Sequence, residues 1–314
     1  MTLPHRYIPN QVVKISRGTL NRMPLIIPDK KGELCEAINF IFARSAFICK
    51  IQILALHVEP FGYEAIIIDP DMRRSEFLQM VNQAISLEVK GRITHYESLW
   101  SNQKPGNVPI LDIETLKSEI IKLSVAPVRN GYVRKRSDWE LPHIEPADWG
   151  IEKTHYVCRE NKELGKAIMC PGQNKFALGG EIVVNMHTKI EELLPSLVAE
   201  IDAFEVAEKR RRKRVLGIKK CQCKSTFLTH KSKTGAKYTD HKVVVLCAAP
   251  KRFDEIDTFL KSYYKKYRTA LIQFIRARSK SGKEGFPEGT LTMRTLFRVG
   301  CIPHQGTEPF EFLF

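Results

Sequence analysis

The sequence predicts an α+β protein in which helices cover one face of an antiparallel sheet and a basic, mainly helical region follows. Two observations lead to this prediction. The first is the order of apolar periodicities in residues 1–137, where segments of period two alternate with segments of helical period. The second is the position of the charge. The 314 residues include 50 Lys and Arg against 35 Asp and Glu, and the basic surplus is confined to one C-terminal segment.

Seven segments of the first part follow the order β-α-β-β-α-β-α. Short runs rich in β-branched or alternating apolar residues predict strands at 11–16, 51–58, 63–68 and 108–111. Helical spacing predicts helices at 32–47, at 76–89 after a Ser75 cap, and from Asp112 or Thr115 through Ser124, with Pro127 ending the run. This order is the ferredoxin-like pattern, in which helices lie on one face of the sheet and the other face is free.

The rest of the chain changes character twice. Residues 138–188 are rich in Pro, Gly, Trp and His and have weak periodicity, so an irregular extension is expected there. Amphipathic spacing predicts two long helices, over 189–214 and 253–278. We therefore expect a domain of residues 1–137, the extension, and a basic helical region of residues 189–314.

Composition excludes several classes of protein. A chain that is 43% hydrophobic and 27% charged is not a disordered one, and no apolar run reaches the ~18 residues that a membrane helix needs. The first 11 residues lack the apolar core of a signal peptide, so a cytoplasmic location is expected. Eight cysteines spread over the chain do not form the dense framework of a small disulfide-bonded secreted protein.

The charge surplus sits in residues 207–285. This segment holds 23 of the 50 Lys and Arg residues and 6 of the 35 Asp and Glu residues, a net charge of +17, whereas the remainder has a net charge of −2. Segregation of this kind is typical of a surface that contacts a phosphate backbone or an anionic membrane. The candidate DNA-contacting residues are Lys209, Arg210, Arg211, Arg212, Lys213, Arg214, Lys219, Lys220, Lys224, Lys231, Lys233, Lys265 and Arg268.

Several short blocks occur in a characteristic order. The most specific is Gly131-Tyr132-Val133, followed after five residues by Trp139 and preceded by the sequence PVRN at 127–130. The other blocks are Ile15 with Thr19 and Pro28, then Phe77, Val81, Asn82 and Trp100, and finally Gly285 to Gly289 after the second basic helix. Together they resemble the single-tyrosine HUH transposases of bacterial insertion sequences, in particular the REP-associated tyrosine transposases, although Ala126 stands where the family usually has Asn.

The resemblance implies an active site that this chain does not carry. In the family, a histidine–x–histidine pair on a central strand binds a divalent metal, and a tyrosine on a later helix attacks the scissile phosphate. The matching positions are Gly62 and Glu64 for the histidines and Lys122 for the tyrosine. The resemblance therefore implies a protein that binds hairpin or palindromic DNA, with the DNA single-stranded or folded as a hairpin. It also implies that the protein has lost catalysis and needs no cofactor. Assembly as a homodimer is a further possibility.

Other functions stay open at this point. An active transposase or nickase could use Mg²⁺ or Mn²⁺ on His57 and Glu64, with Tyr96 or Tyr132 as a relocated nucleophile. The simpler interpretation is a partly buried His57, a solvated Glu64 and a Tyr132 that packs in a turn. Cys221, Cys223, His230 and His241 suggest zinc, but a Cys-x-Cys pair does not match the usual spacing of structural sites. A module that binds RNA or an anionic membrane is the third alternative, and only the charge supports it.

Overall fold

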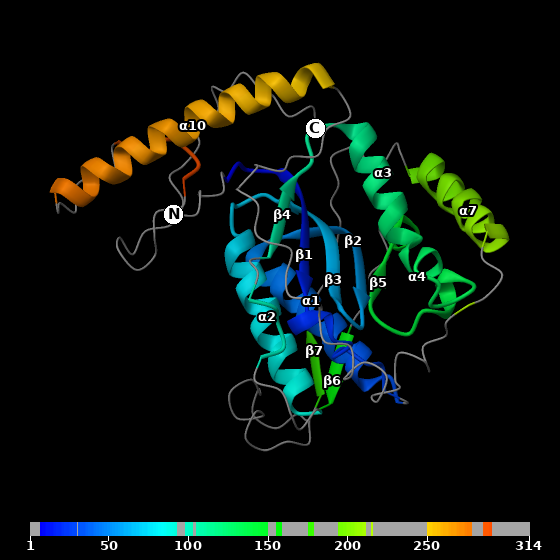
Figure 1. The fold of residues 1–314 in the computed structure, drawn as a ribbon. Helices are drawn as coiled ribbons and strands as arrows, with labels where there is room; N and C mark the ends of the chain where they lie inside the picture. The colour runs from blue at the N-terminus through cyan, green and yellow to red at the C-terminus, as the bar shows by residue number, and fades with distance from the viewer. Residues whose placement is uncertain are drawn as a thin grey trace.

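The computed structural model describes residues 7–29, 31–92, 98–102, 105–149, 155–158, 175–178, 194–211, 215, 250–277 and 285–290. In it, a five-stranded antiparallel sheet lies at the centre, and helices pack on both of its faces (Figure 1). The mixed class predicted from the sequence, helices with an antiparallel sheet, is confirmed. Among the described residues, no helix has the length and apolar character required to cross a membrane.

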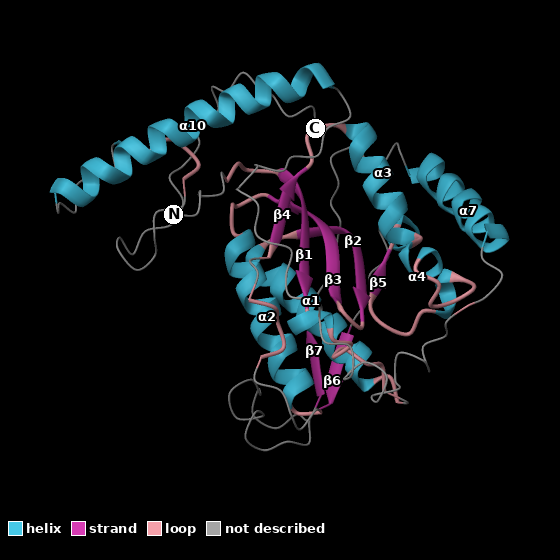
Figure 2. Ribbon diagram, in the orientation of Figure 1, coloured by secondary structure: helices cyan, strands magenta, loops and turns pink. Residues whose placement is uncertain are grey.

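The sheet has the strand order β4-β1-β3-β2-β5 (Figure 2). Its strands are β1 (Gln11–Gly18), β2 (Gln52–Glu59), β3 (Gly62–Asp69), β4 (Gly106–Pro109) and β5 (His143–Ile144). The first four lie within two residues of their predicted bounds. The fifth was not predicted, since two residues carry no periodicity. In β3 the run from Ala65 to Ile68 is fully buried on both sides of the strand, which shows that both faces of the sheet are covered.

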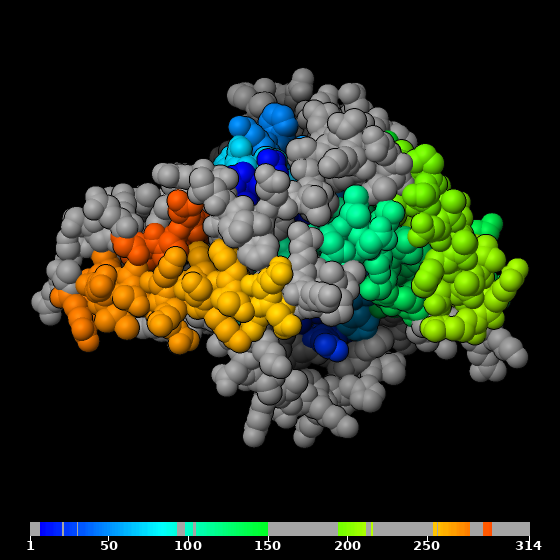
Figure 3. Space-filling view, turned by 90° about the horizontal axis from the view of Figure 1, so that it is seen from above, coloured from blue at the N-terminus to red at the C-terminus, as the bar shows by residue number. Residues whose placement is uncertain are grey.

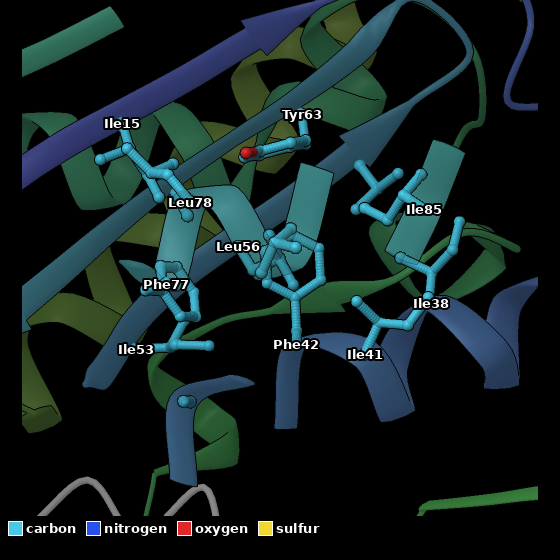
Figure 4. Close-up of a cluster of buried hydrophobic side chains, with 14 of the residues drawn as sticks. Ile15, Ile38, Ile41, Phe42, Ile53, Leu56, Tyr63, Phe77, Leu78 and Ile85 are labelled. Atoms are coloured by element: carbon cyan, nitrogen blue, oxygen red, sulfur yellow. The ribbon is translucent and has the colours of Figure 1, made fainter. Parts of the chain in front are cut away.

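One face of the sheet packs against α1 (Glu33–Cys49) and α2 (Arg74–Lys90). Their shared core contains aromatic rings in edge contact, with Phe42 at 5.3 Å from Tyr63 between ring centroids (Figure 4). The predicted Ser75 cap is wrong, because Ser75 lies inside the helix. The carboxylate of Asp69, at the end of β3, instead accepts the backbone N–H groups of Arg73 and Arg74 at 2.8 and 3.1 Å.

The opposite face packs against α3 (Ile113–Ser124), α4 (Ala126–Arg129) and α7 (Leu194–Arg211). The expectation that this face is free is therefore wrong. Leu116 and Ile120 of α3 are buried against strands that are apolar on both sides. Asp112 is the cap of α3, since its side chain accepts the Thr115 N–H at 2.8 Å. α3 ends at Ser124, as predicted. Pro127 lies in the first turn of the short helix α4, where its missing N–H has no helical partner to lose.

The packing of the described residues continues past residue 137. β5 pairs with β2, and the indole of Trp149 donates to the Leu54 carbonyl at 2.8 Å. Arg136 forms ion pairs with Glu145 at 2.8 Å and with Glu205 of α7 at 3.2 Å. The predicted boundary at residue 137 thus lies inside a packed unit. The short 3-10 helices are Leu20–Arg22, Arg136–Asp138 and Pro146–Asp148, and β6 (His155–Cys158) pairs with β7 (Lys175–Leu178) in a separate two-stranded sheet.

The long helix α10 (Pro250–Ala277) crosses above the ends of the strands β4 and β1 (Figure 1). The 285–290 segment runs along it, with Phe286 packed at 5.6 Å from the ring of Tyr267. The Tyr7 N–H donates to the Gly289 carbonyl at 2.9 Å, which joins this segment to the start of the chain. Both predicted long helices are present in their described parts, as α7 and α10.

Candidate functional site

Two residues that the sequence resemblance matched to catalytic positions, Glu64 and Lys122, lie on elements that pack against each other. Glu64 lies on β3 and Lys122 on α3, and two further residues join them. The Lys14 ammonium on β1 lies 3.0 Å from the Glu64 carboxylate and 3.0 Å from the Glu119 carboxylate. Glu119 in turn accepts from Lys122 at 2.8 Å. We call this set of four alternating charges the α3-face ion-pair chain.

Pairing keeps Lys14 and Glu119, the two central groups of this chain, charged against the effect of burial. Burial lowers the pKa of Lys14, but the carboxylates of Glu64 and Glu119 outweigh it, so the pKa of Lys14 is raised. Burial raises the pKa of Glu119, but hydrogen bonds from Lys122 and Lys14 outweigh it, so the pKa of Glu119 is lowered. Neither shift moves its group toward neutrality near pH 7. The chain is therefore a set of fixed charges rather than a general acid or base.

Gly62 cannot hold a side chain in this structure. Its φ of +147° lies in the region that favours glycine, and a Cβ built there would lie 2.0 Å from the backbone carbonyl oxygen of Arg17 on β1. The backbones of the two strands approach too closely for any larger residue. A histidine at this position would require β1 to move, so the absence of the first ligand is built into the sheet.

His57 and Glu64 are opposite each other in the β2–β3 ladder, but they are not part of a group of three or more candidate metal ligands among the described residues. His57 is buried, and its ring lies 5.4 Å from Trp139 and 5.5 Å from His143 on β5. Burial, with smaller contributions from His143 and Arg129, holds the pKa of His57 well below its ordinary value. The carboxylate of Glu64 is paired instead with Lys14 on the neighbouring strand β1, at 3.0 Å. No group of three or more His, Cys, Asp or Glu within the described ranges could hold a metal ion. Cys221, Cys223, His230 and His241 lie outside those ranges.

Tyr132 has a packing environment. Its ring is stacked on Trp139 with centroids 5.1 Å apart, and its hydroxyl donates to the Glu59 carboxylate at 3.3 Å. Asn130 donates to the same carboxylate at 3.3 Å. Burial raises the pKa of Glu59, and the hydrogen bond from Tyr132 opposes that shift. The tyrosine therefore fixes the turn after α4, as its place in the sequence block suggested. Tyr96 lies outside the described residues.

Five of the predicted DNA-contacting residues are described, and all five are exposed: Lys209, Arg210 and Arg211 at the end of α7, and Lys265 and Arg268 on α10. Figure 3 shows the two helices on opposite sides of α3. Lys209 and Arg211 are partly neutralised by carboxylates of their own helix, Glu205 at 2.6 Å and Glu208 at 3.3 Å. The others lie outside the described residues: Arg212, Lys213, Arg214, Lys219, Lys220, Lys224, Lys231 and Lys233.

Sequence reasoning missed Lys14 and Glu119, the centre of the ion-pair chain. One signal for them exists in the sequence, since Glu119 and Lys122 are three residues apart on a predicted helix and so share a face. Lys14 interrupts the apolar run Val12, Val13 and Ile15 of its strand, which indicates a partner on whatever covers that face. The pairing between them depends on α3 packing over β1 and β3, and the predicted free face concealed it.

The chain has similar solved structures but no match among family models or curated proteins. One such structure is a REP-associated tyrosine transposase bound to a REP hairpin, with 14% identity and a TM-score of 0.35 over 44% of this chain and 79% of that chain. Another is a protein of Deinococcus radiodurans assigned as a transposase, with 16% identity and a TM-score of 0.28 over 38% of this chain and 92% of that chain. At these values the neighbours give no residue a role.

Proposed function

We propose that this protein binds DNA, descends from the single-tyrosine HUH transposases, and no longer cleaves its target. The observation that carries the proposal is the α3-face ion-pair chain. Two positions that the resemblance assigns to one active site, Glu64 and Lys122, are 58 residues apart in the sequence and are joined here through Lys14 and Glu119. If the match between this sequence and the family's motifs were wrong, nothing would be expected to place these two residues on facing elements.

The strand order supports the same descent. The order β4-β1-β3-β2, with every neighbouring pair antiparallel, corresponds to the ferredoxin-like pattern that the resemblance implies. The helix that carries Lys122 follows β4 and lies over the face on which Glu64 stands. This is the arrangement that an attacking tyrosine and a strand-borne metal site would need in order to meet at one phosphate.

The chemistry of the ion-pair chain argues against retained cleavage. Attack on a phosphodiester needs a nucleophile that can form a covalent phosphate bond and a cation that polarises the phosphate. The Lys122 ammonium is bonded to Glu119, and Glu64 is bonded to Lys14 rather than turned to an open metal position. The position of the first histidine is closed by the approach of Gly62 to Arg17. Of the three positions that the resemblance assigns to catalysis, two thus carry ion-paired side chains and the third is closed by the neighbouring backbone.

DNA as the partner follows from the segregated charge. Residues 207–285 carry the net +17, and the described basic residues of α7 and α10 are exposed on the protein surface. Contacts to phosphates would position the protein, while base contacts would choose the sequence. A hairpin or palindromic target, single-stranded DNA and assembly as a homodimer remain predictions.

Binding and cleavage can be tested in the same reactions. We expect the protein to bind a fluorescent hairpin oligonucleotide with an affinity that falls steeply as salt rises, measured by anisotropy. With Mn²⁺ or Mg²⁺ added, a denaturing gel should show neither a shortened oligonucleotide nor a covalent adduct. An adduct would overturn the inactive assignment and favour the alternative of a nickase with substituted residues. Failure to bind hairpin, linear single-stranded or duplex DNA would overturn the proposed function as a whole.

A further inference from the structure

A hollow between α10 and the 285–290 segment has the composition of a phosphate site. Its volume is about 350 Å³, and it is lined by Lys265, Lys266, Thr269, Ala270, Gln273, Gly285 and Pro287. Most pockets that take small ligands measure about 300–1,000 Å³. The hollow is therefore at the small end of that range, and it is larger than one water molecule by about tenfold.

Buried contacts between α10 and the 285–290 segment hold the two sides of the hollow in place. Phe286 packs between Tyr267 and Phe274, at 5.6 and 6.4 Å between ring centroids. The hydroxyls of Tyr263 and Thr290 are 2.8 Å apart, and Thr290 is fully buried. These contacts hold the 285–290 segment along one side of α10. The lining groups on the two sides of the hollow consequently keep their spacing.

The polar groups of the hollow are mainly cationic donors. Lys265 and Lys266 supply two ammonium groups, and neither forms an ion pair with a carboxylate among the described residues. Lys261, one turn earlier, differs from them because it is paired with Asp257 at 2.5 Å. The Thr269 hydroxyl already donates to the Lys265 carbonyl at 3.0 Å, so the Gln273 amide is the remaining neutral donor. No acidic residue lines the hollow.

Gly285 keeps the hollow open. Its backbone does not require glycine, because its φ is ordinary and a Cβ would lie 3.7 Å from the Cβ of Ala270, a normal contact. A larger side chain at this position would begin beside Ala270 and Gln273, which both line the hollow; the Gln273 amide oxygen lies 4.0 Å from the same Cβ position. Glycine here preserves a space rather than a backbone conformation.

We propose that this hollow binds one phosphate of a nucleic-acid backbone together with its sugar, with Lys265 and Lys266 on the phosphate and Ala270, Gly285 and Pro287 against the sugar. The inference rests on the proposed function, since it assumes that DNA is the partner. It goes beyond that function by naming a discrete subsite on α10, apart from the basic end of α7. Concave, cationic and partly apolar surfaces of this kind follow single strands in proteins that bind them.

The first test removes the charge. The variant Lys265→Gln/Lys266→Gln should bind a single-stranded oligonucleotide with a salt slope about 0.7 smaller than that of the unchanged protein, because the one lost phosphate contact contributes about 0.7. The matched control is Lys31→Gln/Lys90→Gln, which removes the same charge. Lys31 is paired with Glu33. Lys90 is the last residue of α2, a helix about 25 Å long that starts near Gln11 of β1 and extends away from it. The control should leave the slope unchanged.

The second test fills the hollow and keeps the charge. Gly285→Leu should lower DNA affinity about tenfold, whereas Gly91→Leu, at another glycine of ordinary φ at the end of α2, should not. Circular dichroism checks that each variant is folded. If the unchanged protein binds DNA but the lysine variant keeps its slope, or Gly285→Leu keeps its affinity, the subsite is wrong and the proposed function stands.

The source of the phosphate is settled with two further probes. Vesicles of phosphatidylcholine and phosphatidylserine should not sediment the protein, and inorganic phosphate should compete with DNA only weakly. Sedimentation that is lost in Lys265→Gln/Lys266→Gln, with unchanged DNA binding, would overturn the nucleic-acid assignment in favour of a lipid headgroup. Failure of the unchanged protein to bind any DNA would instead overturn the proposed function itself.

Discussion

On the α3 face of the sheet, Glu64, Lys14, Glu119 and Lys122 are held in sequence by contacts of 2.8–3.0 Å between opposite charges. On α10, Lys265 and Lys266 line a hollow without a carboxylate in its walls. The two regions differ in what their charges contact. In the first region the protein uses its charges internally, so they contribute to stability. In the second region, under the proposed function, the charges are available to a partner, so we expect them to contribute to binding and very little to stability.

The largest effect is expected at Gly62, the position that would have to change first to rebuild a metal site on the α3 face. Gly62→Ala should lower the free energy of unfolding by about 4 kcal/mol, because the new Cβ meets the Arg17 carbonyl and the φ of +147° is strained for alanine. Urea unfolding followed by circular dichroism measures it.

Gly32→Ala is the matched control for Gly62. Its φ is +72°, but nothing lies within 4 Å of the Cβ position. It should cost only the ~1–2 kcal/mol of a left-handed alanine. Equal losses at the two glycines would show that the close approach of β3 to β1 is not a constraint.

The next effect concerns pH and the imidazole of His143 on β5. Burial lowers the pKa of His143 to about 4, from an ordinary value near 6.5. Between pH 6.5 and pH 4, His143 is protonated in the unfolded chain but neutral in the folded protein. The stability that is present above pH 6.5 is therefore lost as the pH falls toward 4. The loss should be about 2–3 kcal/mol. Unfolding measured between pH 7 and 4 should show a shallower decline in His143→Phe; the same decline in both proteins would contradict the assignment.

A smaller loss is expected at the centre of the ion-pair chain. Glu119→Gln should destabilise the protein by about 2 kcal/mol, because the carboxylate is nearly buried and Lys14 would keep Glu64 as its sole carboxylate in the chain. Glu114→Gln on the same helix removes a carboxylate that is 70% exposed and pairs with Lys117 at 3.5 Å. Its cost should stay below about 0.5 kcal/mol. Thermal unfolding of the two variants, side by side, tests whether the α3 face depends on its charges.

The smallest effect completes the comparison. Lys265→Gln/Lys266→Gln should change the free energy of unfolding by less than about 0.5 kcal/mol, since both side chains are exposed and neither is paired with a described carboxylate. A loss of stability as large as that of Glu119→Gln would mean that these lysines serve the fold. The distinction between internal and available charge would then fail.

The sequence was informative wherever one segment carried its own pattern. Alternation located β1 to β4, and apolar spacing located α1, α3 and α10, because these signals are local. It was uninformative about β5, whose two residues His143 and Ile144 become a strand only by pairing with β2. It also could not show that α3 covers the second face of the sheet. For that reason Lys122 was identified as a replaced position, while its link to Glu64 through Lys14 and Glu119 was not.

The hydrogen bond from Tyr7 to Gly289 has a mechanical consequence. The Tyr7 ring lies under the guanidinium of Arg74, 4.1 Å from the ring centroid, and the chain then enters β1. A force applied to α10 is therefore transmitted to β1 through Phe286, Gly289 and Tyr7. If DNA binds α10 as proposed, a force on the DNA is carried to β1, the strand beside the edge strand β4.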